Sequence, residues 1–334
     1  MMPDIRAFIR PELRDLKPYV NLRQSHDLGI LLDLNESPWD REDKSNRYHS
    51  DFSALTAQLA TLYGIASDEI LLTRGSDEGI DLLIRLFCRP YYDAILICPP
   101  TFSMYRFYAK LQGITVMETP GDCENIKILF LCSPNNPTGH TTAPDEIFEL
   151  CQKLAEKAIV VVDEAYIEFS TTESMTSYIQ RYPNLVVLRT LSKAFGLAGL
   201  RCGALIAHKQ LVQYLRAVLA PYPFSTATIQ AAMDATKPAC VVALKERVRC
   251  ILTQRKIMQT ALTALCCVKK VWPSEANFLL VEFNDAKKIY ATCLENGIRL
   301  RDVSNEPGLE NCLRISIGLP EQNESLINVL RKCV

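Results

Sequence analysis

Three apolar, largely β-branched runs that each lead into polar residues constrain the fold of this chain most strongly. The runs are residues 128–132, 159–162 and 185–188. A continuous apolar run of this length is typical of a strand that is buried on both faces of a parallel sheet. Asn136, Asp163 and Lys193 follow the three runs. Because the carboxyl ends of strands in open α/β sheets form the ligand crevice, we expect these side chains to meet around one small molecule.

The rest of the chain predicts two domains and an N-terminal arm. Between residues 51 and 203, helical spacing in 53–63 and 80–87 alternates with short strands, which predicts an α/β fold with a mostly parallel sheet flanked by helices. After residue 238 a long helix and three alternating strands predict a smaller α/β domain with an antiparallel sheet. We therefore expect an arm over 1–45 that packs on the main body, a large domain over 46–237 and a small domain over 238–334.

Charge and composition favour a small-molecule partner. The 37 Lys and Arg nearly balance the 38 Asp and Glu, so no overall field attracts nucleic acid or an anionic membrane. The first residues lack a signal-peptide core, and no apolar run approaches the ~20 residues that span a bilayer, so we expect a cytoplasmic protein. The four histidines and thirteen cysteines show no metal-ligand spacing, and we expect no metal site.

The residues at the three strand ends match the needs of a pyridoxal phosphate site. Lys193 would supply the amine that bonds to the cofactor aldehyde, and Asp163 would pair with the pyridinium nitrogen. Tyr166 and Asn136 could donate hydrogen bonds to the phenolic oxygen, and Tyr105 could stack on the ring. Read singly, these side chains could equally be a surface lysine, a helix cap, a turn asparagine and core tyrosines.

A second group of residues could hold the cofactor phosphate. Gly75, Ser76 and Asp77 open a predicted helix, whose first N–H groups and positive dipole end favour an anion. Ser-Asp is also an ordinary helix start, so this signal is weak alone. Thr190, Ser192 and Arg201 would complete the cradle, with Arg201 as its fixed charge.

These motifs together resemble the fold-type I aminotransferases, and within them the histidinol-phosphate aminotransferases. The segments that carry the resemblance are CSPNNPTG (132–139), DEAYIEF (163–169), RTLSKAFGLAGLRCG (189–203), RGSDEGI (74–80), APYP (220–223) and LKPY (16–19). The resemblance covers nearly the whole chain. It implies a pyridoxal phosphate-dependent enzyme that exchanges an amino group between L-histidinol phosphate and 2-oxoglutarate in histidine biosynthesis.

The resemblance also implies roles for individual residues. Lys193 would move the proton during transfer, while Ser76, Asp77, Ser192 and Arg201 would hold the phosphate. The protein would be a homodimer in which Tyr48 enters the partner's site. The remaining expected substrate-binding residues are Arg301, Arg314, Tyr19 and Asn35. Arg314 alternates with apolar residues on a predicted strand, where a rigidly held arginine suits a phosphate or a carboxylate, although an exposed strand face is the ordinary alternative.

The chain departs from the usual sequence pattern of the family at two places, and three alternative functions remain to be considered. The segment 119–125 is shorter than is usual in the family, and His49 stands where a proline is usual after the tyrosine. An aromatic amino acid aminotransferase and a threonine-phosphate decarboxylase would use the same fold. A regulator that binds the cofactor without catalysis is disfavoured, because Lys193, Asp163 and Arg201 are intact and no basic patch is present.

Overall fold

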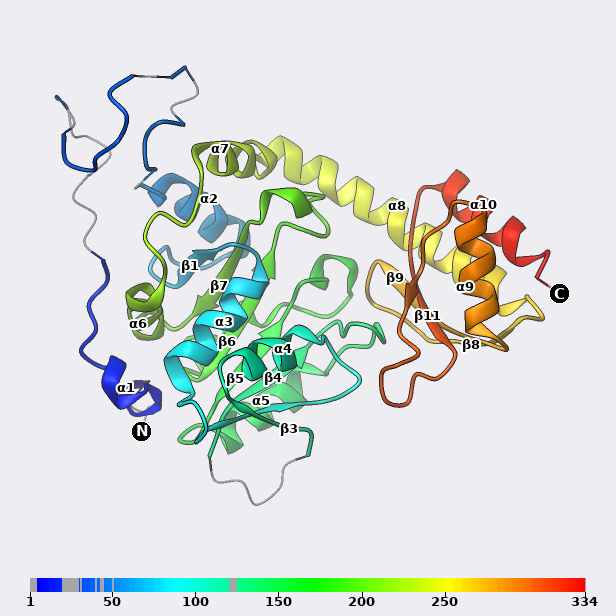
Figure 1. Cartoon of the computed structure of the whole chain (residues 1–334), viewed down its shortest axis with the longest axis horizontal. Helices are drawn as coiled ribbons and strands as arrows, with labels where there is room; N and C mark the ends of the chain where they lie inside the picture. Colours follow the sequence, from blue (N-terminus) through cyan, green and yellow to red (C-terminus); the bar gives the residue numbers. More distant parts are fainter. Residues whose placement is uncertain are drawn as a thin grey trace.

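The protein has two lobes that are joined by one long helix (Figure 1). The computed structural model describes residues 5–19, 30, 32–39, 41–42, 45–49, 51–119 and 125–333. The strands are β1 (Ile70–Thr73), β2 (Ala94–Ile97), β3 (Thr115–Met117), β4 (Ile126–Cys132), β5 (Ile159–Asp163), β6 (Leu185–Thr190), β7 (Gly203–Ala207), β8 (Val268–Val271), β9 (Phe278–Phe283), β10 (Arg301–Asp302) and β11 (Cys312–Ser316). The α-helices are α1 (Ile5–Phe8), α2 (Ser53–Tyr63), α3 (Ser76–Phe87), α4 (Met104–Leu111), α5 (Pro144–Lys153), α6 (Lys209–Val218), α7 (Thr226–Ala235), α8 (Pro238–Thr263), α9 (Ala286–Glu295) and α10 (Pro320–Leu330). The short 3₁₀ helices are η1 (Pro11–Leu13), η2 (Ile167–Phe169), η3 (Met175–Tyr178) and η4 (Ala198–Leu200).

The large lobe is built on a seven-stranded sheet in the order β1-β7-β6-β5-β4-β2-β3. Strands β3, β2, β4, β5 and β6 are parallel to one another, whereas β7 runs antiparallel to both β6 and β1. The connection from β6 to β7 has no α-helix that would return the chain to the other end of the sheet, so the reversal is expected. The mostly parallel α/β fold that the sequence predicts is therefore confirmed.

Helices cover both faces of this sheet, which explains the continuous apolar runs. In β4, Phe130 packs with α3, α4 and α6 on one face, while Leu129 and Leu131 pack with α2, α5 and η3 on the other. Strands β5 and β6 are buried along their whole length. Burying an apolar side chain of this size is worth about 1.5–3 kcal/mol, so these central strands fix the frame that carries Asp163 and Lys193.

The small lobe contains a four-stranded antiparallel sheet in the order β10-β11-β9-β8. Helices α9, α10 and the end of α8 pack on it through a separate apolar core. Of its strands, β10 is the shortest, because only Arg301 and Asp302 pair with β11. The helix α8 begins at residue 238 and crosses from the large lobe to the small one. The predicted domain boundary at 238 stays a prediction.

The start of the N-terminal arm packs on the large lobe. Ile5, Phe8 and Ile9 are buried in the core on the α3 face, and the Arg10 amide donates to the Leu86 carbonyl at 3.1 Å. Just after the predicted arm, the Tyr48 ring stacks on Tyr222 with the ring centres 4.6 Å apart. The short segment noted at 119–125 lies largely outside the described residues. No helix in the part of the chain that the structure describes is long and apolar enough to cross a membrane.

Candidate active site

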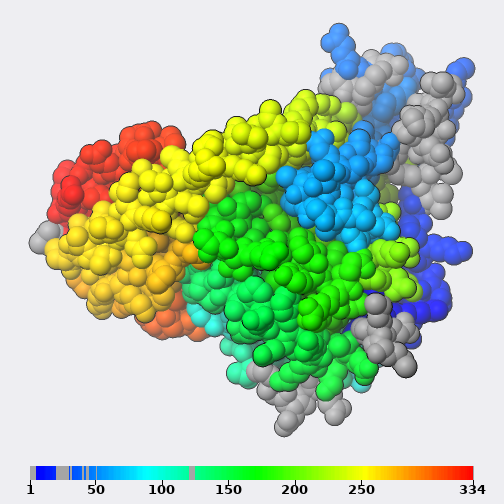
Figure 2. Space-filling view, turned by 180° about the vertical axis from the view of Figure 1, so that it is seen from behind, coloured from blue at the N-terminus to red at the C-terminus, as the bar shows by residue number. Residues whose placement is uncertain are grey.

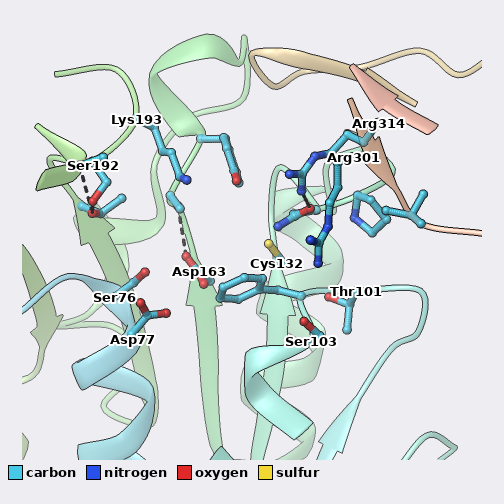
Figure 3. A pocket seen from close by; sticks show the side chains of 18 of the residues that line it. Ser76, Asp77, Thr101, Ser103, Cys132, Asp163, Ser192, Lys193, Arg301 and Arg314 are labelled. Carbon is cyan, nitrogen blue, oxygen red and sulfur yellow. Dashed lines mark hydrogen bonds between the residues drawn. The ribbon is translucent and has the colours of Figure 1, made fainter. Parts of the chain in front are cut away.

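A cavity of about 320 Å³ lies where β4, β5 and β6 end, between the large sheet and the small lobe (Figure 3). It is lined by Ser76, Asp77, Thr101, Phe102, Ser103, Cys132, Asn136, Pro137, Asp163, Ala165, Tyr166, Thr190, Ser192, Lys193, Ala198, Arg201, Arg301, Val303, Glu306 and Arg314. In Figure 3, Ser76, Asp77 and Ser192 stand on one side, Arg301 and Arg314 enter from the other, and Asp163 lies between them. This is the carboxyl edge of the parallel strands, where the sequence predicts a ligand site.

Asp163 is a buried carboxylate at the end of β5. Its side chain accepts hydrogen bonds from the Tyr105 hydroxyl at 2.9 Å and from the Ala165 amide at 3.1 Å. Burial raises the pKa of Asp163 from 3.8 to about 6, and the two hydrogen bonds oppose that rise. An anion held in this position can stabilise a proton on a nitrogen of a bound molecule, since a buried carboxylate gains most from a cationic partner.

Lys193 reaches into the cavity from the segment that follows β6. Its Nζ lies 5.5 Å from the centre of the Tyr166 ring, and Figure 3 shows its side chain directed toward Asp163. Burial, followed by the charge of Arg314, lowers the pKa of Lys193, while Asp77 and Asp163 oppose that shift. A lowered pKa increases the neutral fraction of the amine, which is the form that attacks a carbonyl group.

A cradle for an anion forms between the start of α3 and the segment 190–201 on both sides of Lys193. Arg201 Nη2 donates to Asp77 Oδ2 at 2.9 Å, and Nη1 lies 3.5 Å from Ser192 Oγ. The Thr190 hydroxyl donates to Ser192 Oγ at 2.9 Å. The hydroxyls of Ser76 and Ser192, the N–H groups of the α3 N-terminus and the guanidinium of Arg201 provide donors of the kind that bind a phosphate.

Glycine at position 75 lets the arginine approach this helix start. Gly75 has φ of 78°, and a Cβ atom on it would lie 2.9 Å from Arg201 Nη2. Arg201 itself has φ of 49°, an uncommon conformation for a residue other than glycine. Both backbones are therefore held in conformations that bring the guanidinium against the α3 N-terminus. The Asp77 carboxylate accepts a hydrogen bond from Arg201 and so helps to hold the guanidinium in this place.

Two arginines of the small lobe form the opposite wall. Arg301 and Arg314 are paired neighbours on β10 and β11. Arg314 Nη1 donates a hydrogen bond to Asn136 Oδ1, and this bond connects the small lobe to the loop after β4. The Arg314 guanidinium also lies 5.3 Å from the Phe278 ring centre. Burial lowers the pKa of Arg314, but guanidinium stays charged at neutral pH, so this wall is cationic.

The structure brings eleven of the predicted site residues into one cavity. They are Ser76, Asp77, Asn136, Asp163, Tyr166, Thr190, Ser192, Lys193, Arg201, Arg301 and Arg314. Their individual roles toward cofactor and substrate stay predictions. Among the residues that sequence reasoning missed, Thr101, Phe102 and Ser103 follow a buried strand, as the predicted residues do, and that position was the available signal. Glu306 lies in the loop between β10 and β11 and has no comparable signal.

The prediction that Tyr105 stacks on the cofactor ring is corrected by the structure. Tyr105 is fully buried, stacks on Phe130 with the ring centres 4.7 Å apart, and hydrogen bonds to Asp163. The ring that lines the cavity is Phe102. The reason is that α4 begins at Met104, so Phe102 precedes the helix while Tyr105 lies in its first turn and turns into the core.

Three predicted residues lie outside the cavity of their own chain. Tyr48 is 53% exposed and stacks on Tyr222, and Tyr19 packs edge-on against Tyr222 with the ring centres 6.1 Å apart. Asn35 has φ of 54°. None of the three lines the cavity described above. The roles of Tyr19 and Asn35 in binding substrate, and of Tyr48 in a partner's site, stay predictions.

The site combines a lysine, a buried aspartate and an anion cradle at the ends of parallel strands. This arrangement is that of a pyridoxal phosphate-dependent enzyme, and comparison with known proteins agrees. Residues 44–330 match the family described as aminotransferase class I and II, and the chain belongs to this family. It is 39% identical to a histidinol-phosphate aminotransferase of Escherichia coli, over 98% of each chain. It is 42% identical to histidinol-phosphate aminotransferase 2 of Idiomarina loihiensis, over 99% of each chain.

Solved structures share the fold. A histidinol-phosphate aminotransferase from Clostridium acetobutylicum is 24% identical with a TM-score of 0.76, over 84% of this chain and 88% of that one. An L-threonine-O-3-phosphate decarboxylase from Porphyromonas gingivalis is 26% identical with the same TM-score, over 86% and 91%. The enzymes of this family depend on pyridoxal phosphate, and the predicted cofactor is confirmed.

The residues of this cavity fit that cofactor. The donors around Gly75 suit its phosphate, the Asp163 carboxylate suits its ring nitrogen, and the Lys193 amine suits its aldehyde. Phe102 offers an aromatic ring in the same cavity. The phosphate, the ring nitrogen, the aldehyde and the ring face of the cofactor thus each have a chemically suitable neighbour.

Proposed function

We propose that this enzyme transfers the amino group of L-histidinol phosphate to 2-oxoglutarate, giving imidazole acetol phosphate and glutamate in histidine biosynthesis. The observation that carries the proposal is the cationic wall of Arg301 and Arg314 opposite Lys193, in a chain of this family. One wall with fixed positive charge suits two substrates that alternate in the same site, because each presents an anionic group far from its reacting carbon. The full-length identity of 39–42% to enzymes with this name supports the same substrate.

The residues of the chain divide the work of the reaction. The bound cofactor supplies an electron sink that stabilises negative charge on the carbon next to the transferred nitrogen. Lys193 Nζ would hold the cofactor aldehyde in the resting enzyme and would then accept the proton that leaves the reacting carbon of the substrate. Asp163 would keep a proton on the ring nitrogen of the cofactor, and Asn136 and Tyr166 would hold its ring oxygen. Arg314 orients the substrate, so that its reacting carbon lies within reach of Lys193.

The decarboxylase and the aromatic aminotransferase are the competing activities. Fold does not distinguish them, since the threonine phosphate decarboxylase has the same TM-score as the histidinol-phosphate aminotransferase structure. A decarboxylase must also hold the substrate carboxylate so that the bond to it breaks rather than the bond to hydrogen. The sequence identity of 39–42% over the full length favours amino transfer for this chain.

Spectroscopic titration tests the proposed substrate. Purified enzyme with cofactor is titrated with histidinol phosphate, and in separate runs with phenylalanine and threonine phosphate. We expect histidinol phosphate to convert the lysine-bound cofactor to its amine form and 2-oxoglutarate to restore the original absorbance. A response to phenylalanine alone, or release of carbon dioxide from threonine phosphate, would move the activity to the corresponding alternative.

Replacing Arg314 with alanine should raise the KM for histidinol phosphate by about 10- to 100-fold, because a charge-assisted contact to phosphate contributes about 1.5–3 kcal/mol. The cofactor should remain bound, since the donors of the phosphate cradle are elsewhere. Steady-state kinetics and the absorbance of the cofactor measure the two effects. Arg299, exposed and outside the cavity, offers the matched control Arg299→Ala with unchanged kinetics. An Arg314→Ala enzyme with unchanged KM would remove Arg314 from the substrate site.

A homodimer in the cytoplasm is the assembly and location that we propose. Tyr48 and Tyr222 form a stacked pair whose tyrosine at position 48 is half exposed and outside its own cavity. A second copy that covers this pair would bring Tyr48 to a neighbouring site. Light scattering of the purified protein distinguishes a dimer of 37.6 kDa chains from a monomer.

A further inference from the structure

A second cavity, separate from the active site, lies on the face of the large sheet that α2 and α5 cover. It has a volume of about 550 Å³ and shares no lining residue with the first cavity. The first half of α8, the end of α2 and the segment through η2 and η3 enclose it. Figure 2 shows this side of the molecule, on which α8, in yellow, crosses the green core beside the blue α2.

The floor of this cavity is a buried ion cluster that leaves hydrogen-bonding capacity unused. Arg189 on β6 donates to Glu168 at 2.7 Å and to Glu164 at 3.4 Å, and its guanidinium lies 4.5 Å from the Tyr63 ring centre. Tyr63 and Arg189 are 9% and 8% exposed. Three buried atoms nevertheless have no hydrogen-bond partner among the described residues: Tyr63 Oη, Arg189 Nε and Glu168 Oε2. Tyr63, Glu168 and Arg189 all line the cavity.

Such a concentration of unpartnered atoms is unusual, because folded proteins pair nearly all their buried polar groups. The three atoms belong to one guanidinium, one carboxylate and one hydroxyl, so together they offer both donors and an acceptor. Burial raises the pKa of Tyr63, which keeps its hydroxyl neutral and able to donate. An occupant that satisfies them must therefore accept a hydrogen bond and donate one at the same end.

The remaining walls define the other end of the occupant. Leu62, Phe195, Val241, Leu244 and Val248 form an apolar wall. The charges on the floor are two carboxylates and one guanidinium, because Glu164 also contacts Arg189. The exposed side chains of Glu173, Lys245 and Arg249 also line the cavity, nearer to solvent. At the floor an anionic ligand is disfavoured, since Arg189 already pairs with both carboxylates. A pocket with apolar walls and a few convergent polar groups is the usual form of a small-molecule site.

We propose that this cavity is a second ligand site, which binds a small aromatic or aliphatic ring with a neutral head group that both donates and accepts a hydrogen bond, such as a primary amide. The head group contacts Tyr63, Glu168 and Arg189, and the ring lies under α8. The site also borders the catalytic segment, because Phe195 follows Lys193 by two residues and Arg189 precedes Thr190.

Benzamide is the probe that tests this site, with benzoate as its anionic counterpart. The cofactor-loaded enzyme is titrated with each by calorimetry, and the position of benzamide is found by crystallography of the soaked enzyme. We expect benzamide to bind with a Kd of about 1 mM, as its size allows, with its amide against Arg189 and Glu168. Benzoate should bind about tenfold more weakly or worse, because its charge meets the two carboxylates.

Two variants distinguish this cavity from every other place where benzamide could bind. Tyr63→Phe keeps the ring beside Arg189 but removes the hydroxyl, and should weaken benzamide about fivefold. Val248→Trp fills the apolar part of the cavity and should abolish binding. Unchanged kcat and KM in both variants will show that they fold. The proposal is overturned if benzamide does not bind at about 20 mM, or if it binds both variants as tightly as the native enzyme. It is also overturned by crystals in which water alone contacts the three atoms.

Discussion

Substituting alanine for Lys193 is expected to lower the rate of amino transfer by at least about 10⁴-fold, because it removes both the covalent link to the cofactor and the group that moves the proton. No other lysine lines the active-site cavity in the described part of the chain. Burial and Arg314 lower the pKa of the Lys193 amine, which increases the fraction of the amine that is neutral and able to attack. Single-turnover rates and the visible absorbance of the lysine-bound cofactor measure the loss.

The exposed Lys209 at the start of α6 provides a matched control for this substitution. Lys209→Ala removes the same side chain far from the cavity and should leave both rate and absorbance unchanged. The Lys193→Ala protein should keep its circular dichroism spectrum, because Lys193 projects into a cavity rather than into a core. If the Lys193→Ala enzyme turned over at the native rate, the assignment of the reactive amine would be wrong.

The strand ends that carry chemistry could be predicted because burial leaves a local mark in the sequence. Strands β4, β5 and β6 lie inside the sheet, so both of their faces are apolar, and the first polar residues after each strand mark the edge of the sheet. That rule is enough to bring Asn136, Asp163 and Lys193 to one cavity. It rests on neighbouring residues alone and needs no knowledge of the tertiary contacts.

Other features depend on contacts between distant residues and leave no such mark. Phe102 and Tyr105 are two aromatic residues three positions apart, and only the start of α4 at Met104 decides which of them faces the cavity. The hydrogen bond from Arg314 to Asn136 joins residues that are 178 positions apart. The second cavity likewise forms only when α8 crosses α2 and η3, so its three unpartnered atoms come from separate segments.

Asp163 gives the second prediction of large effect, in which activity and stability change in opposite directions. In the Asp163→Asn enzyme the ring nitrogen loses its anionic partner, and kcat should fall by about 10²- to 10⁴-fold. Without cofactor, however, the buried carboxylate is a cost to the fold, because burial raises its pKa from 3.8 to about 6. At pH values above both the folded and the unfolded pKa, a rise of this size lowers the free energy of unfolding by about 3 kcal/mol.

The direction of the pH effect follows from proton binding. Between pH 4 and 6 the folded protein binds a proton at Asp163 that the unfolded chain does not bind, so this residue contributes stability at low pH that is lost as the pH rises through about 6. Urea denaturation of the cofactor-free proteins should therefore show Asp163→Asn to be more stable than the native chain at pH 8, by up to about 3 kcal/mol, and nearly equal at pH 4. The exposed Asp68, changed to Asn, should show no such difference.

Adding pyridoxal phosphate should reverse that order at pH 8. A pyridinium beside Asp163 provides the positive charge that a buried carboxylate lacks in the cofactor-free protein, so the native chain should gain more stability from the cofactor than Asp163→Asn does. If both proteins gained equally, Asp163 would not face the ring nitrogen. The unfavourable burial of this carboxylate makes the empty site selective for a ligand whose ring nitrogen carries a proton. The buried Tyr105 donates a hydrogen bond to Asp163 and so fixes the direction of the carboxylate.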